Sequence, residues 1–355
     1  MFTRHSAEGD RTVAPGVELR MPRHHGAKSS DLGAQALYGL VDVGGTKVVA
    51  GIARAGEILA TRRVDTDVAE GSDAVMRRMA AAIRDVQADL GLAEVRLTAI
   101  GASVPGPNDL ENGIVLAAHN VGWFDFPFVE RFGTEFGGIP VFMDGDANCA
   151  GVGEARFGAG IGFRHQVYIT VSTGVGGAVI VDGSIYRGWQ GIAGEVGHIP
   201  VLPDGPSCPC GNVGCVEALA SGPAIARRGA ALFVQHQSPL LETLAGGDPT
   251  RVTTKLVFDA ARAGDPSCMA IIDEAGRYLG ILTAAVVQIL NPQAVIFGGG
   301  VMNQADFLLP RIHAEMRRHV YAVHLEGLVL RKAVHGDRSG LYGALGLAIE
   351  GVGAG

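Results

Sequence analysis

The most specific group of reactive side chains is one histidine followed by three cysteines. Nine residues separate His198 from Cys208, and Cys210 and Cys215 follow closely. An imidazole and three thiolates are the four tetrahedral ligands of a closed, structural Zn²⁺ site. The connecting loop is rich in proline and glycine and has no apolar core of its own, so a metal would order it. The alternative is that the cysteines are merely small core residues; their spacing favours zinc.

Two glycine-rich turns have the composition of phosphate-binding loops. Adjacent glycines let the backbone approach a phosphate, threonine adds a hydroxyl donor, and aspartate can hold Mg²⁺ or its water. One Gly-Gly turn is a common structural feature, but two favour a nucleoside triphosphate site, because a polyphosphate needs donors from more than one direction. The residues concerned are Asp42, Gly44, Gly45, Thr46 and Lys47 in the first turn, and Thr173, Gly174 and Gly176 in the second.

Strands must position these turns, and the sequence predicts two similar α/β lobes. Residues 37–58 read as strand, Gly turn, strand, turn and strand, and the pattern recurs at 167–186. A chain of 355 residues exceeds the ~250–300 at which single cores stop growing, so we expect two lobes with both turns facing one cleft. Further helices are predicted at about 72–90, 128–136, 266–290, 301–318 and 340–349, and strands at 97–104, 139–145, 294–300 and near 328.

The composition argues against several functional classes. A net charge of −7, with no Lys/Arg block in the folded part, argues against a nucleic-acid surface. No apolar run approaches the ~20 residues of a membrane span and no secretory signal is recognisable, so a cytoplasmic protein is expected. Cys149 and Cys268 have no metal-ligating neighbours and should be buried apolar residues. Residues 1–35 lack periodicity and are predicted to be a disordered extension, unless the true start is Met21 or later.

Three segments resemble motifs of the ROK family, which is named after repressors, open reading frames and kinases. They are GLVDVGGTK, VSTGVGGAVIVDGSIYRGWQGIAGEVGH and CPCGNVGCVE, similar to its phosphate-binding, signature and zinc segments. The resemblance runs from about Leu37 to the C-terminus and implies a duplicated α/β fold of the actin-like ATPase (ribonuclease H-like) type, and a homodimer. The implied domains are an N-terminal lobe at 36–147 completed by a helix at about 338–355, and a C-terminal lobe at 148–337 with zinc motif 198–215.

The resemblance also implies a reaction, in which ATP phosphorylates the 6-hydroxyl of glucose or a related hexose. Asp146 falls at the family's catalytic aspartate and would accept the proton of that hydroxyl. Taken alone it could be a helix N-cap, with Asp144 as its competitor. His198 would bind zinc through one ring nitrogen and face the sugar with the other. The matching sugar ligands are Asn120, Glu195, His198 and Glu217, Trp123 would pack the lobe, and Gly298, Gly299 and Gly300 resemble the adenosine-binding turn.

One position departs from the family pattern. The residue before the catalytic aspartate is usually an asparagine that contacts sugar hydroxyls, whereas here it is Gly145. A pocket that hydrogen-bonds a hydroxyl discriminates through that bond, so an amino or N-acetylhexosamine is an alternative substrate to glucose. A sugar-responsive transcriptional regulator is another alternative, but about 36 residues without helical periodicity before the first strand are too few for a recognition-helix domain.

Overall fold

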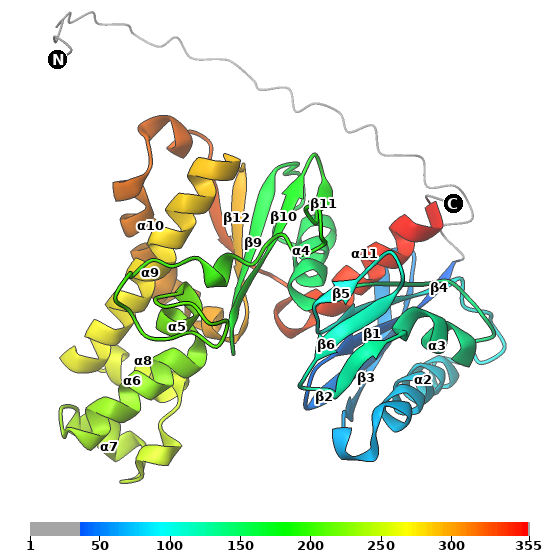
Figure 1. Ribbon diagram of the computed structural model, residues 1–355, viewed down its shortest axis with the longest axis horizontal. Coiled ribbons are helices and arrows are strands. Elements are labelled where there is room, and N and C mark those ends of the chain that lie inside the picture. The colour runs from blue at the N-terminus through cyan, green and yellow to red at the C-terminus, as the bar shows by residue number, and fades with distance from the viewer. Residues whose placement is uncertain (1–35, 354–355) are drawn as a thin grey trace, which may run out of the picture.

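The computed structural model describes residues 36–353, which form two five-stranded sheets of the same topology (Figure 1). The strand orders are β3-β2-β1-β4-β8 and β11-β10-β9-β12-β13. In each sheet the first three strands pair antiparallel and the last two join in parallel, which confirms the duplicated α/β fold. The strands of the first sheet are β1 (Leu37–Val43), β2 (Lys47–Arg54), β3 (Glu57–Asp65), β4 (Ala99–Val104) and β8 (Val141–Gly145). Those of the second are β9 (Gln166–Val171), β10 (Val175–Val181), β11 (Ser184–Tyr186), β12 (Ala294–Gly298) and β13 (Val329–Lys332).

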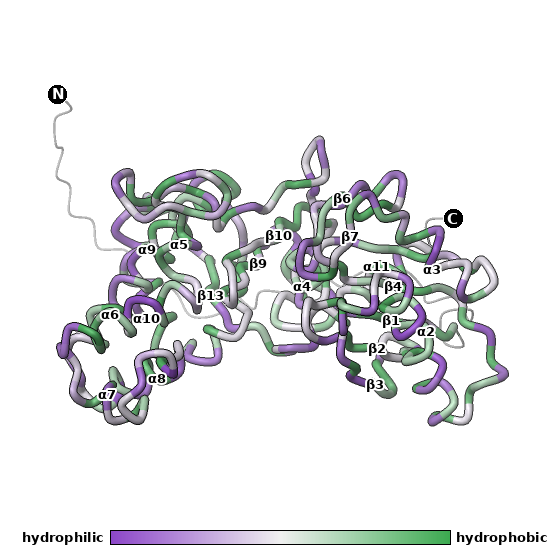
Figure 2. The backbone as a smooth tube through the Cα atoms, turned by 60° about the horizontal axis from the view of Figure 1, so that its bottom comes forward, coloured by the Kyte–Doolittle hydropathy of each residue, from purple (hydrophilic) through white to green (hydrophobic). Residues whose placement is uncertain are grey.

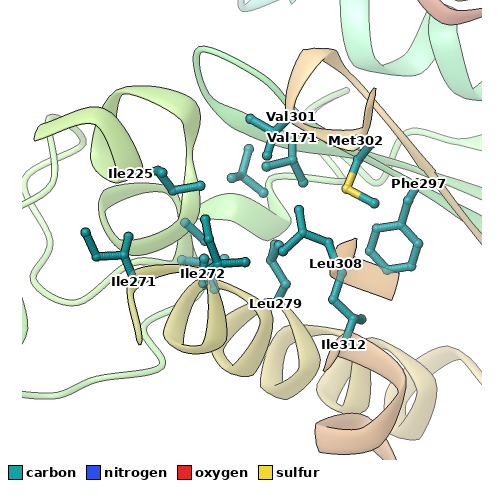
Figure 3. Close-up of a cluster of buried hydrophobic side chains, with 14 of the residues drawn as sticks. Val171, Ile225, Ile271, Ile272, Leu279, Phe297, Val301, Met302, Leu308 and Ile312 are labelled. Carbon is teal, nitrogen blue, oxygen red and sulfur yellow. The ribbon is translucent and has the colours of Figure 1, made fainter. Parts of the chain in front are cut away.

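Helices cover the outer face of each sheet. In the first lobe α2 (Ser72–Asp89) and α3 (Phe128–Glu135) share a buried apolar core with β1, β2 and β4. The second lobe is larger, and Figure 3 shows Leu279 of one outer helix between Ile272 of the same helix and Leu308 of another, with Phe297 of β12 beyond Leu308. Its outer helices are α5 (Val216–Ala220), α6 (Gly222–Val234), α7 (Pro239–Leu244), α8 (Thr254–Arg262), α9 (Pro266–Leu290) and α10 (Ala305–His319).

Two helices lie between the sheets, α4 (Asp146–Phe157) and α11 (Ser339–Gly353) (Figure 1). α4 follows the first sheet but packs against the second, and α11 ends the chain against β1 and β4 of the first. The two helices also pack on each other through glycine, since a side-chain carbon on Gly343 would stand 1.8 Å from the backbone oxygen of Cys149. The chain therefore crosses between the lobes twice, and the central layer has little room for larger residues.

A third, small sheet was not predicted from the sequence. It has the order β5-β6-β7 and consists of β5 (Asn108–Asp109), β6 (Ile114–Ala118) and β7 (Trp123–Phe126). Trp123 is fully buried there and stacks on Phe126 with 4.9 Å between ring centroids, as a packing role requires. These strands have two to five residues and little alternation, which is why sequence periodicity missed them.

The predicted helix over 266–290 coincides with α9, whereas the one predicted at 301–318 divides. Its first turn is the 3₁₀ helix η4 (Gly300–Gln304), and α10 begins at Ala305. The remaining short 3₁₀ helices are η1 (Val68–Glu70), η2 (Val196–His198), η3 (Pro249–Arg251), η5 (Ala322–Leu325) and η6 (Gly336–Arg338). Figure 2 shows hydrophobic segments running through both lobes, with hydrophilic ones on outer loops. Within 36–353 no helix has the length and apolarity needed to span a membrane. The predicted extension, residues 1–35, lies outside the described residues.

Candidate active site

A cleft of about 510 Å³ between the lobes brings together most residues that the sequence singled out. It is lined from the first lobe by the β1–β2 turn, from the second by the β9–β10 turn, and between them by the start of α4. The two glycine turns therefore face one space, as predicted. The predicted residues that line it are Asp42, Gly44, Lys47, Asp146, Thr173, Gly174, Gly176, Glu195, His198, Glu217, Gly299 and Gly300.

Asp146 lies where this cleft meets a smaller recess that is lined from both lobes. It is the first residue of α4, and both Asp146 and Glu195 line the cleft and the recess alike. One carboxylate oxygen accepts a hydrogen bond from the Ala147 amide at 2.7 Å. The side chain is reached by solvent from the cleft, yet the protein around it disfavours its charge and raises its pKa. A carboxylate whose pKa is raised toward neutrality is a better proton acceptor than an ordinary surface aspartate.

Asp42 stands at the other side of the cleft floor, at the end of β1. Burial raises its pKa to about 6, and the nearby Asp146 carboxylate adds to the effect while Lys47 opposes it. The turn that follows is held by Thr66, whose hydroxyl donates to the Gly44 carbonyl at 2.6 Å. The Lys47 ammonium lies 3.8 Å from Asp337 of η6. Carboxylates at this depth, held by a fixed turn, are suited to a hydrated divalent cation that accompanies a polyphosphate.

The second glycine turn is braced by Glu217 of α5. One Glu217 carboxylate oxygen accepts from the Val175 amide at 3.0 Å, and a side-chain carbon on Gly174 would lie 2.5 Å from that same oxygen. Glu217 comes two residues after Cys215, so the cysteine cluster and the turn are connected by one short segment. From the sequence, Glu217 was expected only to contact the sugar. The structure shows that it also contacts the second glycine turn.

A further cavity of about 620 Å³ opens from the cleft beside Thr173 and Gly300. Its lining includes the apolar side chains of Pro223, Ala226 and Val301, so it offers apolar area for a flat ring. Gly299, which lines the cleft next to Gly300, has a backbone φ of 87°, and an added side-chain carbon would be 2.4 Å from the Val171 carbonyl oxygen. Only glycine fits this turn.

The four predicted metal ligands converge. Their ligating atoms all lie within 4.8 Å of one another, with 3.6 Å from His198 Nδ1 to Cys208 Sγ and 3.7 Å between the sulfurs of Cys210 and Cys215. Tetrahedral thiolates ~2.3 Å from zinc stand ~3.7 Å apart, so the donor set and its spacing fit Zn²⁺. The other ring nitrogen, Nε2, is 3.8 Å from Glu195 Oε2 on the cleft side.

Four predicted residues lie beside the cleft. Thr46 is exposed in the β1–β2 turn, and Gly298 ends β12 against the Tyr168 hydroxyl. Asn120 is exposed in the turn before β7 and abuts Gly45, where a side-chain carbon would be 2.8 Å from Asn120 Cβ. Asn120 and Gly45 therefore form one contact at the rim of the first lobe.

The ion pair of Asp144 and the position of Asn108 were not predicted from the sequence. Asp144 is only 1% exposed, and its side chain accepts hydrogen bonds from Arg187 Nε at 2.7 Å and from Asn148 Nδ2 at 2.8 Å. The ion pair between Asp144 and Arg187 therefore connects β8 to the second lobe. Asn108 lines the recess with Asp146. Only the motif register separated Asp146 from Asp144, and Asn108 belonged to no recognised pattern.

Two lobes of one topology with glycine-rich turns facing a shared cleft define an actin-like ATPase fold. The chain belongs to the ROK family, because the family model described as "ROK family" matches residues 38–351. A glucokinase of Halalkalibacterium halodurans is 35% identical over 305 residues, covering 85% of this chain and 92% of the relative.

Two solved structures of ROK-family kinases are similar to this chain in both fold and sequence. A ROK hexokinase from Thermus thermophilus has a TM-score of 0.76 and 35% identity, covering 90% of this chain and 100% of that one. A ROK glucokinase from Streptomyces griseus, in complex with glucose and AMPPNP, has a TM-score of 0.74 and 34% identity over 89% of this chain and 100% of that one.

Proposed function

We propose that this chain is an ATP-dependent hexose kinase that phosphorylates the 6-hydroxyl of glucose or a close relative. The observation that carries the proposal is the position of Asp146, at the junction of a small polar recess and a cleft lined by two glycine-rich turns. A sugar in the recess and a nucleotide in the cleft would meet at this carboxylate. The chain's similarity to glucokinases over most of its length supports the same reaction.

Asp146 is the proposed general base. The sugar hydroxyl must lose its proton as it attacks the terminal phosphorus of ATP, and the leaving group is ADP. The raised pKa of Asp146 suits it to accept that proton and release it after transfer. Mg²⁺ carried by the nucleotide would neutralise charge on the phosphates, and Asp42 is positioned to hold it through water.

The proposed nucleotide site extends from the two turns into the further cavity. Backbone amides of the turns and Lys47 would bind the phosphates, and the apolar lining at Pro223 and Ala226 would take the adenine. The full set of proposed ATP and Mg²⁺ contacts is Asp42, Gly44, Gly45, Thr46, Lys47, Thr173, Gly174, Gly176, Gly298, Gly299 and Gly300.

The proposed sugar contacts are Asn120, Asp146, Glu195, His198 and Glu217. Zn²⁺ would be structural: bound by His198, Cys208, Cys210 and Cys215, it would fix the His198 ring so that Nε2 faces the cleft. An N-acetylhexosamine is the second candidate substrate, since a side-chain carbon added at Gly145 would meet nothing within 4 Å and the recess could admit a larger substituent there.

We also propose the domain division inferred from the sequence, 36–147 with 338–355 and 148–337, which the two crossings of the chain support. A cytoplasmic location, a homodimeric state and the absence of a nucleic-acid partner are proposed with it.

The test is a coupled ADP-release assay over a panel of glucose, mannose, glucosamine, N-acetylglucosamine and N-acetylmannosamine. We expect turnover with glucose or one of these sugars, and a 6-phosphate product by ³¹P NMR. ADP release that no sugar on the panel stimulates would overturn the proposal. Sugar-dependent DNA binding without turnover would point instead to a regulator.

A further inference from the structure

An amide in the sugar recess has a hydrogen-bonding oxygen without a partner. Asn108, the first residue of β5, lines the recess together with Gly145, Asp146 and Glu195. Its Oδ1 is buried and accepts no hydrogen bond from any described residue. A buried acceptor left unpaired costs stability, and such groups persist where a ligand or water completes them.

The surrounding backbone confines the amide to this spot. A side-chain carbon on Gly106 would lie 2.5 Å from the amide atoms of Asn108, so only glycine lets the side chain lie there. The Asn108 carbonyl oxygen faces Gly191 of the second lobe, 3.9 Å from where a side-chain carbon would be. Asn108 therefore stands at the border between the lobes, on the wall of the recess.

The same recess lacks a polar side chain immediately before Asp146. Gly145 has φ −61° and ψ 151°, which any residue adopts, and a side-chain carbon there would meet nothing within 4 Å. An asparagine at 145 would thus fit without strain and would bring a further amide into the recess. Asn148 also lines the recess, but its amide nitrogen donates to Asp144 at 2.8 Å, so Asn108 is the recess amide whose oxygen has no partner among the described residues.

We propose that Asn108 is a specificity-determining sugar contact. Its amide oxygen accepts a hydrogen bond from a ring hydroxyl of the hexose, and its amide nitrogen donates to a neighbouring sugar oxygen. This inference rests on the proposed function and adds to it the residue that recognises the substrate from the first lobe, where Gly145 offers no side chain.

The experiment compares Asn108→Ala with the wild type on the best hexose. We expect the KM for sugar to rise about 10- to 100-fold, because a hydrogen bond from a recognition site is lost, while kcat and the KM for ATP at saturating sugar change little. The melting temperature without sugar should stay or rise, since an unpaired acceptor is removed. The thermal shift produced by added sugar should shrink, a readout that needs no turnover.

Deoxy sugars identify the contact. The wild type should bind one of the 2-, 3- or 4-deoxy analogues about 10- to 100-fold more weakly than the parent, and Asn108→Ala should lose this discrimination. Gly145→Asn in the Asn108→Ala background should recover part of the sugar affinity. Asn112→Ala is the matched control, because Asn112 is an exposed amide on the same hairpin that bonds Asp109 at 2.8 Å outside the recess.

Equal sugar KM values for wild type and Asn108→Ala would overturn the inference, as would an equal loss for the parent and every deoxy analogue. These results differ from failure of the proposed function, in which the wild type itself turns over no hexose. A lower melting temperature in Asn108→Ala with unchanged sugar affinity would assign Asn108 a structural role instead.

Discussion

At the scale of single residues, the cleft contains two carboxylates, Asp42 and Asp146, whose pKa values are raised because burial disfavours their ionised form. Asp42 has a folded-state pKa of about 6, compared with ~3.9 for an unperturbed aspartate. Its raised pKa means that ionisation above pH 6 destabilises the fold, and that this penalty fades as the pH falls from 6 toward 4. If Asp42 holds the metal of the nucleotide as proposed, the site gives up stability at neutral pH for that role.

Asp42→Asn should accordingly stabilise the nucleotide-free protein at pH 7.5 by about 1–3 kcal/mol and abolish activity. The gain should shrink when urea unfolding is repeated near pH 4.5. Asp248→Asn is a control of opposite sign, because hydrogen bonds from Thr250 lower the pKa of Asp248 and its replacement should not stabilise. A gain for Asp42→Asn that is independent of pH would contradict this account.

Asp144 gives a second prediction at this scale. Arg187→Met leaves a carboxylate that is 1% exposed with two of its three donors, the Gly145 amide and Asn148. We expect a loss of about 1–3 kcal/mol in unfolding free energy, below the usual cost of breaking a buried pair because Arg187 is about one-third exposed. Asp144→Asn combined with Arg187→Met should lose less than the two single losses together. If the losses of unfolding free energy measured in urea are strictly additive, Asp144 and Arg187 do not stabilise the fold as a pair.

At the scale of elements, the sequence predicted best where local signals agree. α9 begins after the capping Asp265 with proline at its first position and ends at Asn291 in the left-handed conformation before Pro292, so its bounds were predicted correctly. β5, β6 and β7 pair with near neighbours in sequence, but they were missed because strands of two to five residues with little alternation leave no periodic signal. Asn108 was missed because it belongs to no recognised motif, while residues inside long motifs, such as Asp146 and His198, were brought to the cleft as expected.

The segment from η2 to α5 should depend on its metal. Cys210→Ser removes one thiolate, so we expect zinc content to fall, proteolysis within 199–215 to accelerate, and the sugar KM to rise at least several-fold as His198 loses its orientation. Ser207→Ala, an exposed neighbour in the same loop, should leave all three unchanged. Zinc-free wild-type protein with full sugar affinity would refute this role.

At the scale of the whole molecule, the two lobes depend on the close approach of α4 and α11. Gly343→Ala introduces a carbon 1.8 Å from a backbone oxygen of Cys149 and should cost about 3 kcal/mol or more, or prevent folding. Gly353→Ala, at the end of the same helix with nothing within 4 Å, should be neutral or slightly stabilising. Melting temperatures would decide, and similar values for both variants would contradict the packing described.

The walls of the recess beside Asp146 could not be predicted from the sequence. The repeated strand pattern predicted two lobes and one cleft, but the recess beside Asp146 is formed by residues from both lobes, including Gly106, Asn108 and Gly191. Such a pocket exists only after β5 and the loop before Glu195 meet. The periodicity of the sequence does not reveal which distant segments come into contact. The motif residues were therefore predicted, and the residues that form the walls of the pocket were not.

The most direct test of the central claim is the kinetics of Asp146→Asn, which keeps the size of the side chain and removes its basicity. We predict that kcat falls by about 10²–10⁴-fold while the calorimetric affinity for the sugar stays within a few-fold of wild type. A variant that retains kcat within a factor of a few would contradict the claim that Asp146 takes the proton of the attacking hydroxyl.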